Sequence, residues 1–161
     1  MDFFLQNLSD LFTVFFLSML PITELQGGIT YGLTVLHMSP LLACLAGILG
    51  STTSAMLLIA FLEPSTKWLR KHFKIFDRFF AWLFERTRAK YSESMSHLGH
   101  FALFGYIAIP TPGSGAWTGA LIAHLFGIPL KKSLPILGLG LICTGLIVTF
   151  GVEGLLLLFR A

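Results

Sequence analysis

Two short polar interruptions in an otherwise apolar sequence hold the residues with the most chemical potential. The first, residues 20–28, places Glu24 between a proline and a pair of glycines. The second, residues 109–115, contains two prolines, two glycines and Ser114. A carboxylate in an apolar block costs roughly 3 kcal/mol, so such acids usually mark an ion or proton pathway. We therefore predict that Glu24 couples protons; the alternative is a loop that reaches water and keeps Glu24 hydrated.

Polar and aromatic side chains near these interruptions are the candidate substrate contacts. Their hydroxyl, amide and indole groups can bind a polar substrate, and the neighbouring glycines permit tight backbone geometry. Helices that restart near Gly27 and Ala116 would also direct free N–H groups at the site, which favours an anion. Alternatively, the hydroxyls only satisfy backbone groups that proline leaves free. The candidate substrate-binding residues are Thr23, Gln26, Tyr31, Pro110, Thr111, Pro112, Ser114, Trp117 and Thr118.

No grouping in the sequence indicates catalysis or a metal. The three histidines between residues 97 and 124 lack the spacing of a zinc site. Nothing places His124 beside Ser114, so an intramembrane serine protease is not indicated. The two cysteines, Cys44 and Cys143, lie in apolar stretches and behave as small hydrophobic residues. We predict a protein that is not an enzyme, with no catalytic residue, no metal and no cofactor.

The composition indicates an integral membrane protein. Of the 161 residues, 55% are hydrophobic and 12% are charged, and the mean hydropathy is +0.79. A soluble domain of this size leaves much of its surface outside and could not bury so much apolar area. This excludes a cytosolic enzyme, a disordered chain and a disulfide-rich secreted module. Membrane lipids, rather than nucleic acid, are the expected surroundings.

The hydrophobic pattern predicts an all-α fold in a single membrane domain, residues 1–161. Two stretches, 41–62 and 134–159, are long enough to span a bilayer, which needs about 20 apolar residues. The stretches 3–38 and 101–127 are interrupted by proline and glycine, and we predict that each forms a re-entrant helical hairpin. Two kinked full spans are the alternative.

A matched spacing suggests that the two halves form an inverted repeat. Pro21 precedes Pro40 by 19 residues, and Pro110 precedes Pro129 by the same 19 residues. Each interrupted stretch is followed by an uninterrupted span. Paired interrupted segments in two halves are the best sequence indication of a transporter's binding site.

Basic residues predict the orientation. Eight of the 11 lie between Lys67 and Lys90, and Lys131 and Lys132 form a second cluster. By the positive-inside rule both clusters are cytoplasmic, in the plasma (inner) membrane of a prokaryote. The linker, residues 64–97, has an apolar stripe at helical spacing and is predicted to form an amphipathic helix on the membrane surface. The stripe consists of Leu69, Phe73, Phe76, Phe80 and Leu83.

The motifs PITELQGGITYG (21–32) and PTPGSGAWTGA (110–120) resemble those of a known family. The chain is similar to the putative small multidrug export proteins, which resemble the wider DedA/VTT membrane proteins in layout. That resemblance implies two re-entrant hairpins and a transport activity, with Glu24 as the proton-sensitive acid and residues 110–117 lining the substrate site. Where this chain has Gln26, the family typically has arginine, which is the usual bidentate partner of a phosphate.

We therefore expect a proton-coupled multidrug exporter that works by alternating access at the hairpin tips. Two substrate classes stay open: a lipophilic cation, which suits an acid without a nearby base, and a phosphate-bearing lipid such as polyprenyl phosphate, which suits helix N-termini. A non-transporting membrane scaffold subunit is the third possibility. A homodimer is the simplest closed assembly for so small a chain.

Overall fold

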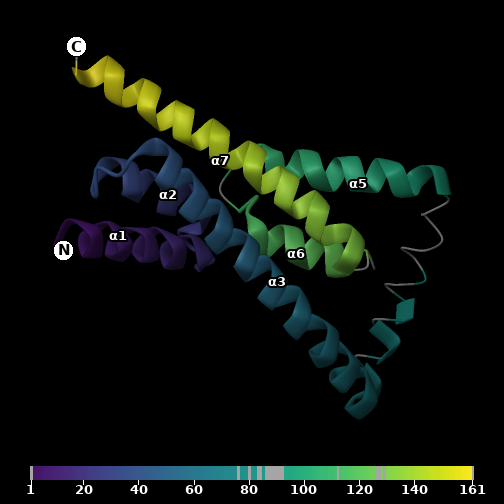
Figure 1. The fold of residues 1–161 in the computed structure, drawn as a ribbon. Coiled ribbons are helices and arrows are strands. Elements are labelled where there is room, and N and C mark those ends of the chain that lie inside the picture. Colours follow the sequence, from purple (N-terminus) through teal and green to yellow (C-terminus); the bar gives the residue numbers. More distant parts are fainter. Residues whose placement is uncertain are drawn as a thin grey trace.

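The computed structural model describes residues 2–75, 77–79, 81–82, 85, 93–111, 113–125, 128 and 130–160. The described residues form helices and turns without any strand, which confirms the predicted all-α class. In chain order (Figure 1) the helices are α1 (Asp2–Met19), α2 (Glu24–Thr34), α3 (Pro40–His72), α5 (Glu93–Ala108), α6 (Ala116–Leu125) and α7 (Leu130–Arg160).

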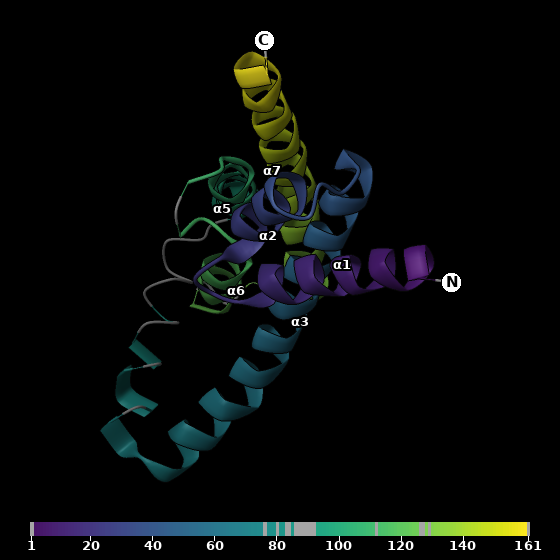
Figure 2. The same ribbon diagram turned by 90° about the vertical axis from the view of Figure 1, so that its left-hand side faces the viewer.

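Two long helices form the frame of the molecule. Helix α3 has 33 residues and α7 has 31, and both are long and apolar enough to cross a membrane. At 1.5 Å per residue each exceeds the roughly 30 Å of a hydrocarbon core. They contact each other and extend beyond the other helices at opposite ends (Figures 1 and 2). Both predicted spans therefore correspond to real helices, although α3 continues through Pro64 to His72, ten residues past Leu62.

The other four helices form two pairs, α1 with α2 and α5 with α6. In each pair the first helix ends just before a proline and the second runs back beside it. Helix α1 ends at Met19 and α5 ends at Ala108, each two residues before a proline, Pro21 or Pro110. Proline lacks an N–H group and its ring clashes with the preceding turn, which favours the end of both helices at these positions. The returning helices α2 and α6 are short. As a result the start of α1 and the end of α2 lie near one end of the molecule, while the start of α5 and the end of α6 lie near the other (Figure 1).

The short returning helices supply the centre of the core. Helix α1 packs on α3 and α5 packs on α7, while α2 and α6 each contact both long helices. The buried hydrophobic cluster between them draws on all helices but α1: Leu25, Ile29, Leu33, Ala43, Ala55, Ile59, Leu103, Ile107, Ala116, Ala120, Ala123, Leu137 and Leu141. The two short helices thus hold the broken ends near the middle of the molecule.

Small residues on α3 let the first helical pair approach closely. Ala43, Gly47, Ser51 and Ala55 are all buried along one face of the helix. A Cβ atom added at Gly47 would lie 2.6 Å from Ile29 Cγ1. This stripe is a packing seam, the more common role for such a pattern.

The basic linker is not one continuous helix. Phe73, which the stripe places in the middle of an amphipathic helix, has extended backbone (φ −130°, ψ 111°) and ends α3. An ion pair from Arg70 to Asp77 joins the two sides of this break at 3.0 Å. Helical turns resume at residues 74–75 and 77–79. The remaining stripe residues Phe76, Phe80 and Leu83 lie outside the described part of the chain.

We predict that Gly50→Ala destabilises the protein. A Cβ atom at Gly50 would lie 2.2 Å from the carbonyl oxygen of Phe15, so the backbones of α1 and α3 must separate. Overpacking of this kind costs about 1–3 kcal/mol, which should lower the Tm measured in detergent. The control is Gly151→Ala on α7, where an added Cβ meets nothing within 4 Å. Alanine favours a helix, so that Tm should hold or rise; equal Tm values for the two variants would contradict the packing.

Candidate functional site

The two broken helices meet at Glu24. Its side chain is only 7% exposed, although it stands at the start of α2 beside the turn that follows α1. The backbone N–H groups of Gly113 and Gly115, in the turn between α5 and α6, donate hydrogen bonds to its carboxylate. A Cβ atom at Gly115 would lie 2.5 Å from the carboxyl carbon, so a side chain there would displace the carboxylate. The acid of one turn therefore sits against the backbone of the other.

The backbone of Glu24 is itself strained. Its φ of +51° is in the left-handed region, which costs a non-glycine residue about 1 kcal/mol or more. Its N–H donates to the carbonyl of Leu20 at 2.9 Å, which closes the turn around Pro21. The surrounding contacts hold this conformation, which directs the carboxylate at the second turn.

Two further hydrogen bonds run between the turns in opposite directions. Trp117 Nε1, on α6, donates to the carbonyl of Met19 at 2.8 Å, at the last residue of α1. Gln26 Nε2, on α2, donates to the carbonyl of Thr111 at 3.0 Å, between α5 and α6. Each helical pair thus supplies a side chain that bonds a backbone carbonyl of the other pair.

The second turn is braced from within. The buried Ser114 hydroxyl lies 2.8 Å from the carbonyls of Ile109 and Thr111 and accepts the Thr111 N–H at 3.0 Å. Tyr106, on α5, donates from its hydroxyl to the carbonyl of Gly113 at 3.1 Å, and Gly113 has a φ of +85°. These bonds keep the Gly113 and Gly115 N–H groups in position for the carboxylate.

Hydroxyls also satisfy the carbonyls at the broken helix ends. Thr23 donates to the carbonyl of Leu17 within the first turn. Ser51 of α3 donates to the carbonyl of Ser18 at 2.9 Å, and Thr144 of α7 donates to that of Ile107. These hydroxyls do what the alternative interpretation expected of such groups, which is to replace bonds lost at the prolines.

The structure brings five of the predicted site residues into one contact network, which we call the tip junction: Glu24, Gln26, Thr111, Ser114 and Trp117. Thr23 and Pro110 lie beside it and shape the breaks. Tyr31 is seven residues along α2, about 10 Å from Glu24, and is 38% exposed. Thr118 is half-buried on α6, and Pro112 lies outside the described residues.

Sequence reasoning did not identify two parts of the junction. Gly113 and Gly115 were expected to allow tight geometry, not to bind the acid through their N–H groups. Tyr106 was missed, although its position one helical turn before Pro110 on an interrupted helix was a usable signal.

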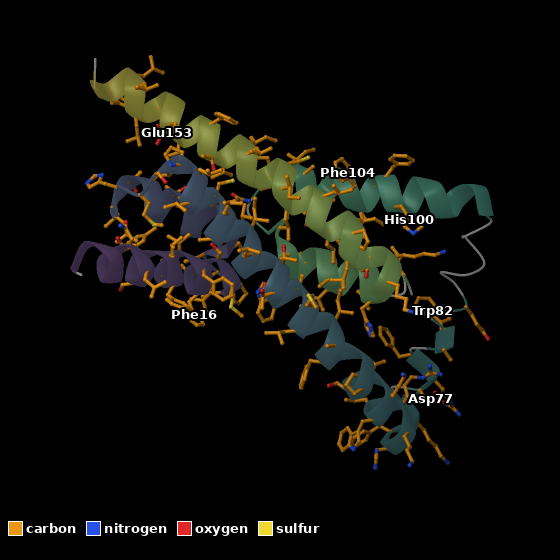
Figure 3. All side chains as sticks on the ribbon, viewed as in Figure 1. Phe16, Asp77, Trp82, His100, Phe104 and Glu153 are labelled. Carbon is orange, nitrogen blue, oxygen red and sulfur yellow. The ribbon has the colours of Figure 1, made fainter. Side chains whose placement is uncertain are left out.

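An apolar groove runs from the tip junction along the outer face of α1. It has a volume of about 760 Å³ and is lined by Ser9, Phe12, Thr13, Phe16, Leu17, Met19, Leu20 and Trp117. Phe16 points outward from α1 (Figure 3). Because Trp117 belongs both to the groove and to the tip junction, and bonds to Met19 of the groove, an apolar group in the groove would lie next to the tips. Among the described residues no group of three or more His, Cys, Asp or Glu side chains could hold a metal ion.

The fold and the junction define a class of protein: an all-α membrane protein whose interrupted helices meet in its interior around one acid. The sequence profile described as "putative small multi-drug export protein" matches residues 24–147, about three quarters of the chain. The chain therefore belongs to the small multidrug export family, which is described as an export family and not as an enzyme family. No curated protein and no solved structure is significantly similar to the chain.

The junction predicts slow amide exchange at the second turn. In the native protein the N–H groups of Gly113 and Gly115 are held by Glu24. Glu24→Ala removes the acceptor, so exchange in a peptide covering residues 113–116 should accelerate about tenfold or more, the equivalent of at least about 1.4 kcal/mol. Hydrogen exchange with mass spectrometry measures this. The matched control is Glu153→Ala on α7, which should leave that peptide unchanged; equal effects of both variants would contradict the contact.

Proposed function

We propose that this protein is a membrane transporter of the small multidrug export type, in which protonation of Glu24 loosens the tip junction. The observation that carries the proposal is the contact of the Glu24 carboxylate with the N–H groups of Gly113 and Gly115. Hydrogen bonds to an ionised carboxylate are roughly twice as strong as neutral ones. A proton on Glu24 therefore weakens the bond between the two tips and lets them separate.

We further propose that the two helical pairs are re-entrant hairpins related as an inverted repeat. Each pair begins and ends near one end of the molecule, and the two ends are opposite (Figure 1). Ser18 and Ile107, whose carbonyls accept hydroxyls from α3 and α7, are 89 residues apart, as are Pro21 and Pro110. The contacts of the two pairs also correspond. Helix α2 of the first pair packs on α7, and helix α6 of the second pair packs on α3.

The basic clusters orient this arrangement in the proposed membrane. Thr66, next to Lys67, bonds to His124 at 2.9 Å, which brings the end of α3 to the end of α6. The exposed Lys131 and Lys132 follow shortly on α7. Both clusters therefore lie at the same end, which the positive-inside rule places in the cytoplasm of a prokaryotic cell.

Competition for one carboxylate supplies the coupling. A proton and a lipophilic cation both neutralise Glu24, so binding of one favours release of the other. The groove beside the junction is lined by Phe12, Phe16 and Trp117. Aromatic rings attract a cation and accept its apolar part. Alternating access then follows from closure of the tips on one side and separation on the other.

One observation favours a second substrate class, the phosphate-bearing lipids. The donors that hold Glu24 are backbone N–H groups just before α6, a common setting for phosphate. A phosphate would replace the carboxylate there once Glu24 is protonated. The neutral Gln26, already bonded to Thr111, supplies no guanidinium for this purpose. We therefore rank the lipophilic cation first.

A second copy of the chain is the simplest way to enclose the pathway. Ile22, two residues from Glu24, is 94% exposed, so one side of the first tip is uncovered in a single chain. A homodimer that covers this side would have twice the chain mass in native mass spectrometry from mild detergent, and a monomer under those conditions would contradict it.

The transport proposal predicts that Glu24→Gln abolishes pH-dependent flux. Proteoliposomes loaded with a fluorescent lipophilic cation should lose substrate along an imposed pH gradient. In the variant the flux should fall about tenfold or more and no longer respond to the gradient, because glutamine cannot ionise and therefore neither binds nor releases the coupling proton. Glu153→Gln is the matched control, since it removes an acid of α7 outside the junction.

Other outcomes separate the alternatives. Flux that is equal across pH in wild type and Glu24→Gln would contradict proton coupling. If the Glu24→Gln variant keeps the full cellular activity of the protein, and no flux is measured, the protein would be a scaffold subunit. Native mass spectrometry with polyprenyl phosphate and the cation offered together distinguishes the substrates: retention of the phosphate lipid alone would make lipid transport the function.

The re-entrant arrangement predicts the side from which exposed positions react. Single cysteines at Lys71 and Lys132, in a chain without Cys44 and Cys143, should be labelled by an impermeant maleimide from the same side of the membrane. A cysteine at Ser39, in the exposed turn before α3, should be labelled from the opposite side. Labelling of Lys71→Cys and Lys132→Cys from opposite sides would mean that residues 101–127 cross the membrane once as a kinked span.

A further inference from the structure

Exposed basic side chains gather at one end of the molecule, where α3 ends and α7 begins. We call this the basic surface; its exposed cations are Lys67, Lys71, Lys74, Arg78, Lys131 and Lys132. Within the described part of this region the acids are Asp77, which is paired with Arg70, and the exposed Glu85. Among the described residues, the basic surface therefore carries an excess of positive charge over the acids beside it.

Large apolar side chains alternate with these cations. Trp68 is 56% exposed, Trp82 53% and Ile75 76%, and Phe73 and Phe79 are about half exposed. Asp77 and Trp82 lie at the end of the molecule away from Glu153 (Figure 3). Tryptophan beside lysine and arginine is typical of the headgroup layer of a bilayer, where the ring is half immersed and the charge reaches phosphate.

Local contacts set the shape of this surface. The extended backbone at Phe73 turns the chain at the end of α3, and the Arg70–Asp77 ion pair closes the turn at 3.0 Å. The ring of Trp68 lies against His72, with centroids 4.6 Å apart, and meets the ring of Phe73 edge-on at 6.2 Å. Cations on both sides of the break are thus held together, which lowers the ordering cost of binding.

We propose that the basic surface binds anionic phospholipids of the adjacent leaflet, with lysine and arginine on the headgroup phosphates and the aromatic rings among the glycerol and upper acyl groups. Its cations complement a negatively charged leaflet, and its rings suit a partner that is apolar directly below the charge. A soluble anion would use the charges but not the rings. This binding is independent of Glu24 and of what the protein transports.

The test measures which phospholipid surrounds Trp68 and Trp82. The protein is reconstituted in bilayers in which either phosphatidylglycerol or phosphatidylcholine is brominated near the headgroup, at equal mole fraction, and tryptophan fluorescence is recorded. We expect the association constant of phosphatidylglycerol relative to phosphatidylcholine to be about fivefold or more. This ratio should fall towards one near 1 M salt, where the Debye length is about 3 Å and charges further apart are screened from each other.

Variants assign the preference to the basic surface. Replacing Lys67, Lys71, Lys74 and Arg78 by Gln should abolish the preference, whereas exchanging them within the basic class (three Lys→Arg and Arg78→Lys) should keep it. Trp117 contributes equally to every chain, so differences report the basic surface. The proposal would be overturned if the wild type shows no preference, or if the preference survives in the Gln variant or in high salt. It would also be overturned if inorganic phosphate displaces the lipid more than chloride does at equal ionic strength. The salt series needs no variant and decides the question even if the Gln chain fails to fold.

Discussion

Two helices that stop inside the protein leave backbone groups that must be satisfied there, and the rest of the structure depends on how this is done. Bulk water and lipid cannot serve as partners for groups that are buried. The carbonyls of the buried Ser18 and Ile107 accept the hydroxyls of Ser51 and Thr144. At the tips, the carbonyls of Met19 and Thr111 accept hydrogen bonds from Trp117 and Gln26 of the opposite helical pair. Side chains from each half of the chain thus bond the backbone of the other half at both breaks.

The third link between the turns differs in kind from the other two. Trp117 and Gln26 donate through neutral groups whose strength is constant, whereas Glu24 accepts through a carboxylate whose charge depends on its proton. The left-handed backbone of Glu24 and the absence of a Cβ at Gly115 are both needed to bring the two sides together. Local strain and a restricted residue type thus converge on the one contact in the junction that can be switched.

Apolar run length and proline position predicted the two long helices and both breaks, because each is a local property of the chain. The extension of α3 to His72 and the break at Phe73 were not predictable in this way, since they depend on the Arg70–Asp77 pair and on ring contacts of Trp68. Glu24 could be identified from its apolar surroundings. Its partners could not, because they are peptide N–H groups some 90 residues away and depend on how two hairpins meet. The Ser114 hydroxyl, a candidate substrate contact in the sequence, bonds carbonyls of its own turn.

In the proposed transport function, the two substrate classes left open by the sequence would make the same demand on this junction. Peptide N–H groups attract an anion and Glu24 attracts a cation, but in the structure these groups already satisfy each other. A cation gains the carboxylate only by drawing it away from Gly113 and Gly115, and an anion gains the N–H groups only after Glu24 is neutralised. Either substrate must therefore compete with the contact that joins the tips. In the proposed mechanism, binding of a substrate and separation of the two halves would be one event, and the charge of Glu24 would couple them.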